Sequence, residues 1–434
     1  YRNAFDMAFN ELGDLFVYDA DMEWDFGTPW YRPTRVLHLV KGAEYGWRTG
    51  TAKWPEYYAD SLGSVIDIGP GCPTGVLFGT GAKFPAKYQK ALFILDWTFG
   101  KIYALHLSPD ETTYSAKKEI FVSGRPLPVT DAAIGPDGDM YFTTGGRRLK
   151  SGVYRVSYTG NADTTPVAPP AISDAQEKLK HIQKSTDVEA LWNELGSDDR
   201  MLRYAARISL ERLDINKWVK HYQMAGSPQH IITASLALSR NGADAKIIFS
   251  KLLEIDLKQL NEAQKLEYLR AVSLASIRTG KPVDTIQSEL LKKLDSQYPS
   301  ASSTLNRELC RVLVYLESAQ VLKKTIFLMQ SSVAIKEDIP QDLLIGNTKY
   351  AKDFKNMLKN QPDSQALHYA LMLKNHKLGW DEATVRAYYK WLASAEMKSG
   401  GNSYKGFIKK IRSEAMKNLK PELLVIAKES SKID

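Results

Sequence analysis

Four acidic side chains alternate along one short stretch of the chain: Asp19, Asp21, Glu23 and Asp25. If Tyr18 to Phe26 is extended, the two-residue period of a strand places these carboxylates on one face and the apolar residues between them on the other. Carboxylates on one face repel each other. Water, the nearby Arg32 and Arg35, or a hard cation such as calcium, which binds through several oxygens, can offset this repulsion. The four residues are therefore a candidate calcium site, and a rim neutralised by the arginines is the alternative.

Aromatic and charged residues near predicted turns form a second set of candidates. Trp24, Trp30 and Tyr31 follow or interrupt the acidic run and could stack on a sugar ring, although packing between β-units is the alternative for each. Asp96 and Asp131 border predicted strands beside turns, and Arg147 follows Gly145-Gly146, where it could bind an anionic group. The alternative for the two aspartates is capping of a turn.

Length and composition indicate a globular protein of more than one domain. The chain has 434 residues, of which 44% are hydrophobic and 25% charged, and a prior of roughly 100–200 residues per domain predicts two or three domains. The net charge is +8, but the lysines spread over amphipathic segments and show no pattern of a nucleic-acid-binding module. Cys72 and Cys310 exclude a CxxC zinc site and a CxxCH haem attachment within this sequence. No apolar run is long enough to predict a membrane span.

Residues 1–158 show the pattern of an all-β region. Short runs rich in Phe, Val, Ile and Tyr alternate with Gly, Pro and Asp turns. The stretch from Ala8 to Val17 matches the stretch from Ala133 to Phe142, each predicting a strand, a tight turn and a second strand, and the runs at 74–78 and 91–95 predict a similar pair. Recurring β-units favour three to four blades of a β-propeller. Because the sequence opens at Tyr1 inside such a pattern, we expect it to be a fragment.

The pattern changes after a linker. Residues 159–173 contain three prolines and predict an irregular connection. From residue 174 to residue 434 apolar residues recur at helical spacing, helix after helix, which favours an α-solenoid of the HEAT type, with a non-repeating helical domain as the alternative. The predicted fold class is therefore multidomain β + α: a partial six-bladed-type propeller (1–158), a linker (159–173) and a HEAT-like helical domain (174–434).

Several motifs extend this interpretation. They include YDADMEWDFGTPWYRPTRV, GPGCPTGVLFGTGAKFP, LDWTFGKIYALHL and PVTDAAIGPDGDMYFTTGGR in the β region and GGNSYKGFIKKIR in the helical region. With these motifs the chain resembles a bacterial family of membrane-bound dehydrogenases, typified by planctomycetes and verrucomicrobia. Its members join a propeller of the glucose/sorbosone dehydrogenase type to HEAT-like helices and a C-terminal cytochrome-c-like domain, which would lie beyond Asp434.

The resemblance implies an extracytoplasmic or periplasmic oxidoreductase related to enzymes that oxidise sugars or aldehydes with pyrroloquinoline quinone and calcium. Arg2 and Asn3 match a pair that contacts the quinone, and Tyr18 to Asp21 match the turn that holds calcium. The catalytic base would be a histidine upstream of Tyr1, so the fragment itself would be inactive. Thr98, Pro128 and Thr130 stand where related enzymes place cations that bind the quinone. The loss of these charge-assisted bonds argues against quinone binding in the known mode.

These observations favour a sugar or aldehyde dehydrogenase that passes electrons to a cytochrome c module, with any haem c in a domain outside this sequence. The alternative is a non-catalytic carbohydrate-binding or scaffold protein. In both hypotheses the ligand is a sugar or another polyhydroxylated compound, and the cation, if one binds, is calcium.

Overall fold

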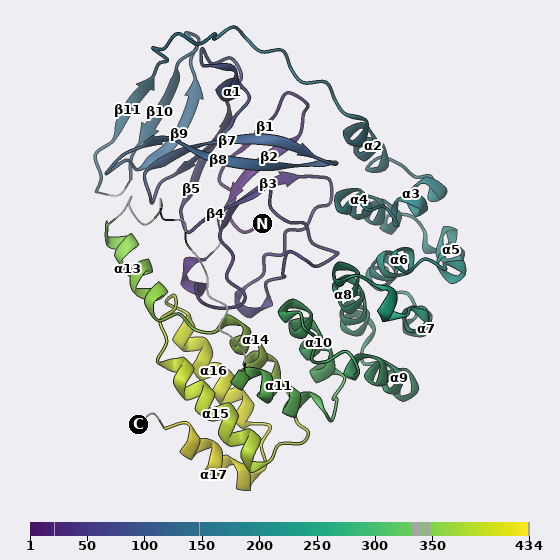
Figure 1. Ribbon diagram of the computed structural model, residues 1–434. Helices are drawn as coiled ribbons and strands as arrows, with labels where there is room; N and C mark the ends of the chain where they lie inside the picture. The colour runs from purple at the N-terminus through teal and green to yellow at the C-terminus, as the bar shows by residue number, and fades with distance from the viewer. Residues whose placement is uncertain are drawn as a thin grey trace.

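The computed structural model describes residues 1–20, 22–146, 148–331, 339, 341, 343 and 348–432. The N-terminal part forms three antiparallel sheets, and helices run from one side of the sheets around and below them (Figure 1). No helix within the described ranges is long and apolar enough to cross a membrane.

Each sheet is a meander in which strands that are consecutive in the chain pair with each other. The first sheet contains β1 (Met7–Phe9), β2 (Leu15–Asp19), β3 (Thr34–Leu39) and β4 (Ile66–Gly69). The second contains β5 (Pro73–Phe78), β6 (Leu92–Asp96), β7 (Lys101–Asp110) and β8 (Thr113–Ser123), with the short helix α1 (Ala86–Gln89) between its first two strands. The third contains β9 (Val129–Ile134), β10 (Met140–Thr144) and β11 (Gly152–Val156). The strand–turn–strand units that the sequence predicts are confirmed.

The second sheet lies between the other two. Leu92 and Ile94 of β6 pack in the core shared with the first sheet, whereas Phe93 and Leu95 pack in the core shared with the third. Alternate side chains of this strand are therefore buried on both faces, which explains its uninterrupted apolar sequence. The first strands of the sheets are neighbours, because β5 contacts both β1 and β9. The three described sheets do not close into a ring, so the propeller remains a prediction.

The loops that follow β2, β4, β6, β8 and β10 meet at one end of the sheets, which we call the rim. The backbone N–H of Trp97 donates to the carbonyl of Cys72 (3.0 Å), and its indole N–H donates to the carbonyl of Gly145 (2.7 Å). The N–H of Gly145 in turn donates to the carbonyl of Pro128 (3.0 Å). Loops of neighbouring sheets are thus tied together by backbone bonds and by the indole N–H of Trp97.

One expectation about local structure is wrong. The chain is not extended from Tyr18 to Phe26, because β2 ends at Asp19 and Glu23–Asp25 form a turn of 3₁₀-helix. The N–H of Phe26 donates to the carbonyl of Glu23, and the Thr28 hydroxyl donates to the carbonyl of Asp25 (2.6 Å). These local bonds replace the ladder bonds of a strand, so Glu23 and Asp25 do not share a strand face with Asp19.

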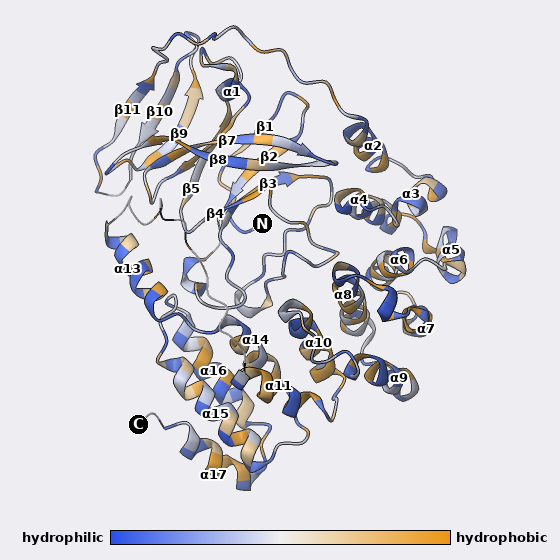
Figure 2. Cartoon of the chain, in the orientation of Figure 1, coloured by the Kyte–Doolittle hydropathy of each residue, from blue (hydrophilic) through white to orange (hydrophobic). Residues whose placement is uncertain are grey.

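The rest of the chain is helical. Between Val156 and Asp174 the chain contains no helix or strand, and helices follow from there. They are α2 (Asp174–Ile182), α3 (Val188–Glu194), α4 (Arg200–Glu211), α5 (Val219–Met224), α6 (Pro228–Arg240), α7 (Ala245–Glu254), α8 (Glu262–Thr279), α9 (Asp284–Asp295), α10 (Ser303–Tyr315), α11 (Val321–Ser331), α13 (Thr348–Lys359), α14 (Ser364–Leu373), α15 (Glu382–Glu396), α16 (Tyr404–Met416) and α17 (Pro421–Ser430). Figure 2 shows hydrophobic and hydrophilic sides on these helices, as the helical spacing predicts.

The helices stack in an arc. α4, α6, α8, α10 and α14 contact one another in that order and form the inner row, while α7 contacts α9 behind it. The intervals between these helices along the chain are unequal, so the HEAT assignment stays a prediction. The inner row shares one hydrophobic core with the first sheet, to which Val17 and Leu37 contribute from the strands.

The long segment between β3 and β4 fills the concave side of this arc. Tyr57 and Tyr58 donate their hydroxyl groups to the buried carboxylate of Glu308 in α10 (2.8 and 3.1 Å). Arg200 at the start of α4 donates to the carbonyls of Tyr58 (2.8 Å) and Ser61 (2.7 Å). The concave surface, which many helical arrays use for partners, is therefore occupied by the chain itself.

Candidate functional site

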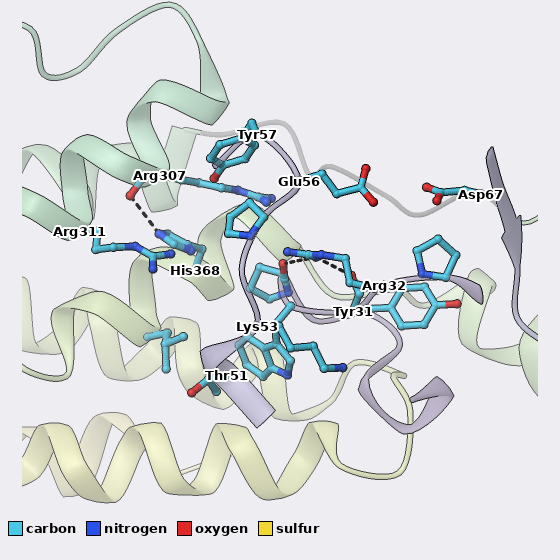
Figure 3. A pocket seen from close by; sticks show the side chains of 15 residues that line it. Tyr31, Arg32, Thr51, Lys53, Glu56, Tyr57, Asp67, Arg307, Arg311 and His368 are labelled. Atoms are coloured by element: carbon cyan, nitrogen blue, oxygen red, sulfur yellow. Dashed lines mark hydrogen bonds between the residues drawn. The ribbon is translucent and has the colours of Figure 1, made fainter. Parts of the chain in front are cut away.

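A cavity of about 300 Å³ lies where the loops of the first sheet meet α10 and α14 (Figure 3). We call it the junction cavity. Its lining combines three kinds of side chain: aromatic rings and prolines, hydrogen-bonding carboxylates, and cations. The lining residues are Pro29, Trp30, Tyr31, Arg32, Pro33, Thr51, Lys53, Pro55, Glu56, Tyr57, Asp67, Arg307, Arg311, His368 and Leu371.

The sheet side of the cavity is built from two proline-containing loops held by backbone contacts. Arg32 donates to the carbonyl of Tyr31 (2.6 Å) within its own loop and to the carbonyl of Trp54 (3.2 Å) in the other. Gly27 has a φ of +83° and lies so close to Pro362 that a Cβ atom would come within 2.9 Å of that ring. A residue without a side chain is therefore needed where this loop turns against the helical region.

An ion pair closes the cavity beneath these loops. The Lys53 ammonium lies 2.9 Å from a carboxylate oxygen of Asp25, and both side chains are almost completely buried. The other oxygen of Asp25 accepts a bond from the hydroxyl of Ser403 (2.5 Å), just before α16. The neighbouring Gly401 donates its N–H to the carbonyl of Phe26 (2.8 Å), and a Cβ there would lie 2.3 Å from the carbonyl oxygen of Trp24. The Gly-Gly-Asn-Ser segment thus docks on the acidic loop.

The helical side supplies two arginines and a histidine. Arg307 and Arg311 are four residues apart in α10 and so lie on one face of that helix. His368 of α14 donates its Nε2–H to the carbonyl of Arg307 (3.0 Å). Burial, and then the positive charges of Arg311 and Arg307, lower the pKa of His368 well below its usual range. His368 is therefore neutral near pH 7.

The acidic lining residues differ in their partners. Glu56 lies 3.0 Å from Arg35, which is buried behind the loop. Asp67 is exposed on β4 and accepts a bond from the hydroxyl of Ser64 (2.8 Å). Desolvation, and then the nearby Glu56 carboxylate, raise the pKa of Asp67 above its ordinary value. Asp67 still has acceptor capacity for a ligand hydroxyl group.

Two of the predicted aromatic residues reach this cavity and one does not. Trp30 and Tyr31 line it, but Trp30 is buried and packs edge-on against Phe407 of α16, with ring centroids 4.8 Å apart. Tyr31 packs edge-on against Phe26 (5.3 Å). Trp24 is 57% exposed and is not among the lining residues. The packing alternative therefore describes Trp30 better than sugar stacking does.

The structure does not gather the predicted calcium ligands into one cluster. Asp19 is buried and accepts bonds from the backbone N–H groups of Arg2 (3.0 Å) and Asn3 (2.8 Å). Glu23 accepts a bond from the N–H of Gly71 (3.4 Å), and Asp25 pairs with Lys53. Asp21 lies outside the described residues. No group of three or more His, Cys, Asp or Glu side chains suited to a metal occurs in the described part of the chain.

At the rim, Asp96 has the environment of a structural group. It is completely buried and accepts bonds from the N–H groups of Phe99 (2.8 Å) and Cys72 (3.2 Å) and from the hydroxyl of Tyr18 (3.3 Å). Burial raises the pKa of Asp96 to about 7, although these three bonds oppose the rise. The bond to Phe99 closes the turn after β6, as the capping alternative predicts.

The remaining predicted rim residues are spread out. Asp131 is exposed on β9 and accepts a bond from the N–H of Ala132 (2.8 Å). Arg147 lies outside the described residues. At the positions where related enzymes would have cations, the Thr130 hydroxyl shares a bond with Thr143 (2.8 Å), and Pro128 and Thr98 line a cavity of about 380 Å³ together with Arg125. The uncharged Thr98, Pro128 and Thr130 do not fit a quinone carrying several carboxylates.

Sequence reasoning missed the main features of the junction cavity. The sequence patterns do not single out Lys53, Arg307, Arg311 or His368 as candidate site residues. The four-residue spacing of the arginines in a helix was the one available signal. It could not reveal the partner surface, because the opposing loop lies about 250 positions earlier in the chain, as the bond from Tyr57 to Glu308 illustrates.

Comparisons with known proteins give limited similarity. No protein-family model and no curated protein matches the chain. Among solved structures, an oxidoreductase (glucose dehydrogenase) from Thermus thermophilus is 19% identical with a TM-score of 0.28, and the match covers 36% of this chain and 45% of that one. Two other glucose dehydrogenase structures are 19% and 20% identical, with TM-scores of 0.31 and 0.30, and their matches cover 37% of this chain and 45% and 46% of theirs. The chain thus spans less than half the length of these proteins, and TM-scores this low do not establish a common fold.

Proposed function

We propose that this protein binds a sugar or another polyhydroxylated compound in the junction cavity. The observation that carries the proposal is the convergence of ring faces with fixed donors and acceptors in one cavity. Tyr31 and Tyr57 supply apolar ring surface, Arg32 supplies donors, and Asp67 supplies acceptors. Ligand pockets typically combine an apolar lining with a few placed polar groups and range from about 300 to 1,000 Å³. A cavity of about 300 Å³ lies at the small end of that range and suits a monosaccharide.

Calorimetric titration of the full chain against a panel of neutral and acidic monosaccharides tests this proposal. We expect saturable binding of at least one sugar, weakened by Asp67→Asn, because the amide replaces one acceptor oxygen with a donor. Asp284→Asn, at an exposed position of α9 outside the lining, is the matched control. If no sugar on the panel binds, or if both variants lose affinity equally, the proposal is wrong.

A second candidate function is oxidation of a sugar or aldehyde by an extracytoplasmic propeller protein that passes electrons to a cytochrome c. The observation that favours it lies at the rim. The backbone of Arg2 and Asn3 is bonded to Asp19, so the pair implied to contact the quinone lies beside the turn implied to hold calcium. The uncharged residues Thr98, Pro128 and Thr130, at the positions where related enzymes have cations, oppose it.

Reconstitution separates the two candidates. The full-length protein with added calcium and pyrroloquinoline quinone would be assayed for dye reduction across the sugar panel, with quinone binding followed by its absorbance. Turnover would support the oxidoreductase function. Sugar binding without quinone binding or turnover would support only the sugar-binding function. For calcium, Asp19→Asn is expected to lower the affinity measured by calorimetry, and unchanged binding would remove this residue from the site.

A further inference from the structure

The charges around the junction cavity are unequally balanced. Lys53 is neutralised by Asp25, and Glu56 faces Arg35, so these four side chains cancel in pairs. Arg307 has no carboxylate within ion-pair distance among the described residues. Its Nε donates to the amide oxygen of Gln365 (2.5 Å), and one terminal nitrogen lies 3.5 Å from the Ser364 hydroxyl. The Arg307 guanidinium therefore keeps donor capacity that no charged side chain uses.

Arg311 adds to this positive charge. Its nearest carboxylate is that of Glu308, with Nε 3.4 Å from the oxygen and no hydrogen bond between them. Glu308 already accepts bonds from Tyr57 and Tyr58, so its charge is shared between these two hydroxyl donors and the Arg311 cation. The Arg311 side chain is 35% exposed. Figure 3 shows the side chains of Arg307 and Arg311 beside His368 on the helical side of the cavity, across from Arg32, Tyr31 and Asp67.

A neutral histidine between two arginines suits an anion. His368 carries no charge near pH 7, because burial and the two arginines lower its pKa. An oxyanion near this wall would relieve the repulsion between the cations and accept charge-assisted bonds from planar guanidinium groups, which match a carboxylate or a sulfate with two parallel bonds. A neutral sugar would leave the arginines without such a partner.

We propose that the junction cavity selects an acidic sugar, whose carboxylate or sulfate group is bound by Arg307 and Arg311 while the ring hydroxyls face Arg32 and Asp67. This inference rests on the proposed sugar binding at the same site and narrows its ligand class. It assigns Arg307 and Arg311 as residues that determine specificity.

The test compares glucuronate, glucose 6-sulfate, glucose and inorganic sulfate by calorimetric titration of the full chain in low salt. We expect an acidic sugar to bind at least about tenfold more tightly than glucose, which corresponds to about 1.4 kcal/mol. Glucuronate and glucose 6-sulfate distinguish the carboxylate from the sulfate as the group that the site prefers. The advantage over glucose should shrink in high salt because ions screen the attraction. Inorganic sulfate should bind more weakly than the acidic sugar because it lacks the ring.

Two variants identify the responsible residue. Arg307→Gln is expected to reduce acidic-sugar affinity to the level of glucose. Arg307→Lys should fall between, because it keeps the charge and loses the paired donors. Arg307→Lys also tests the proposal if Arg307→Gln does not fold. Arg278→Gln, which removes the same charge from an exposed position of α8, should change nothing.

Each outcome has one meaning. If glucose binds as tightly as both acidic sugars, or if Arg307→Gln and Arg307→Lys leave their affinity unchanged, this inference is wrong and sugar binding stands. If no sugar binds, the proposed function and this inference both fail.

Discussion

The carboxylate of Asp60 accepts two hydrogen bonds, each 2.7 Å long, from the guanidinium group of Arg270, 210 residues later in the chain. Both side chains are buried. The guanidinium also lies 4.4 Å from the ring centroid of Trp54 and 4.3 Å from that of Tyr58. One arginine of α8 therefore fixes the position of the long segment between β3 and β4, and with it one wall of the junction cavity.

Removing one partner of this ion pair should be far more damaging than removing both. Burial alone would raise the pKa of Asp60, but Arg270, and then Arg207 and Arg240, lower it, so the carboxylate is charged in the folded protein. Arg270→Met leaves the buried Asp60 carboxylate without this partner and is expected to cost about 3–5 kcal/mol in the free energy of unfolding. Adding Asp60→Leu should recover most of the loss. Urea denaturation of the three proteins measures this, and a double variant no more stable than Arg270→Met would contradict it.

The Asp60–Arg270 pair is a contact that sequence patterns do not predict. Alternation of apolar and polar residues predicts the strand pairs correctly, and the helical period predicts the helices, because each pattern depends on neighbours in the chain. Nothing near Asp60 indicates that its partner is on α8, since ion pairs across 210 residues arise from tertiary packing. The same limit explains the acidic run. The alternation of Asp19, Glu23 and Asp25 predicted one extended face, but a 3₁₀ turn and the docking of Ser403 override it.

A second buried ion pair offers a matched comparison with an exposed one. Lys53→Met removes the cation paired with the buried Asp25 carboxylate, which also accepts a bond from the hydroxyl of Ser403, and should cost about 3–5 kcal/mol in the free energy of unfolding. Lys87→Met removes one partner of Glu119, which also accepts a bond from Tyr88 and pairs with His106. Because the Lys87 side chain is 56% exposed, this variant should cost much less than Lys53→Met. Thermal denaturation of both variants tests the difference, and equal losses would show that Asp25 is not held by Lys53.

The raised pKa of Asp96 predicts a specific pH dependence of stability. The unfolded chain releases this proton near pH 3.8, whereas in the folded protein burial raises the pKa to about 7. The contribution of Asp96 to the free energy of unfolding is therefore fully present below about pH 3.8 and is lost as the pH rises toward 7. The difference between the two pKa values limits this contribution to roughly 4 kcal/mol. Asp96→Asn resembles the protonated acid and lacks this dependence. The stability of the natural protein relative to the variant should fall between pH 4 and pH 8. Urea denaturation across that range measures it, and a constant difference would mean that Asp96 has an ordinary pKa.

A glycine at the rim should be indispensable for a purely steric reason. A Cβ atom on Gly71 would lie 1.9 Å from a carboxylate oxygen of Asp96. The same oxygen accepts a hydrogen bond from the backbone N–H of Cys72. Gly71→Ala must push the buried carboxyl away from Tyr18 and Cys72, and overpacking of this kind costs about 1–3 kcal/mol or more. Gly406→Ala is the matched control, since no atom lies within 4 Å of its Cβ in α16. It should stabilise the protein by about 0.5–1 kcal/mol, because alanine is the better helix former. Chemical denaturation should therefore show shifts of opposite sign for the same substitution, and two shifts of the same sign would contradict the packing around Asp96.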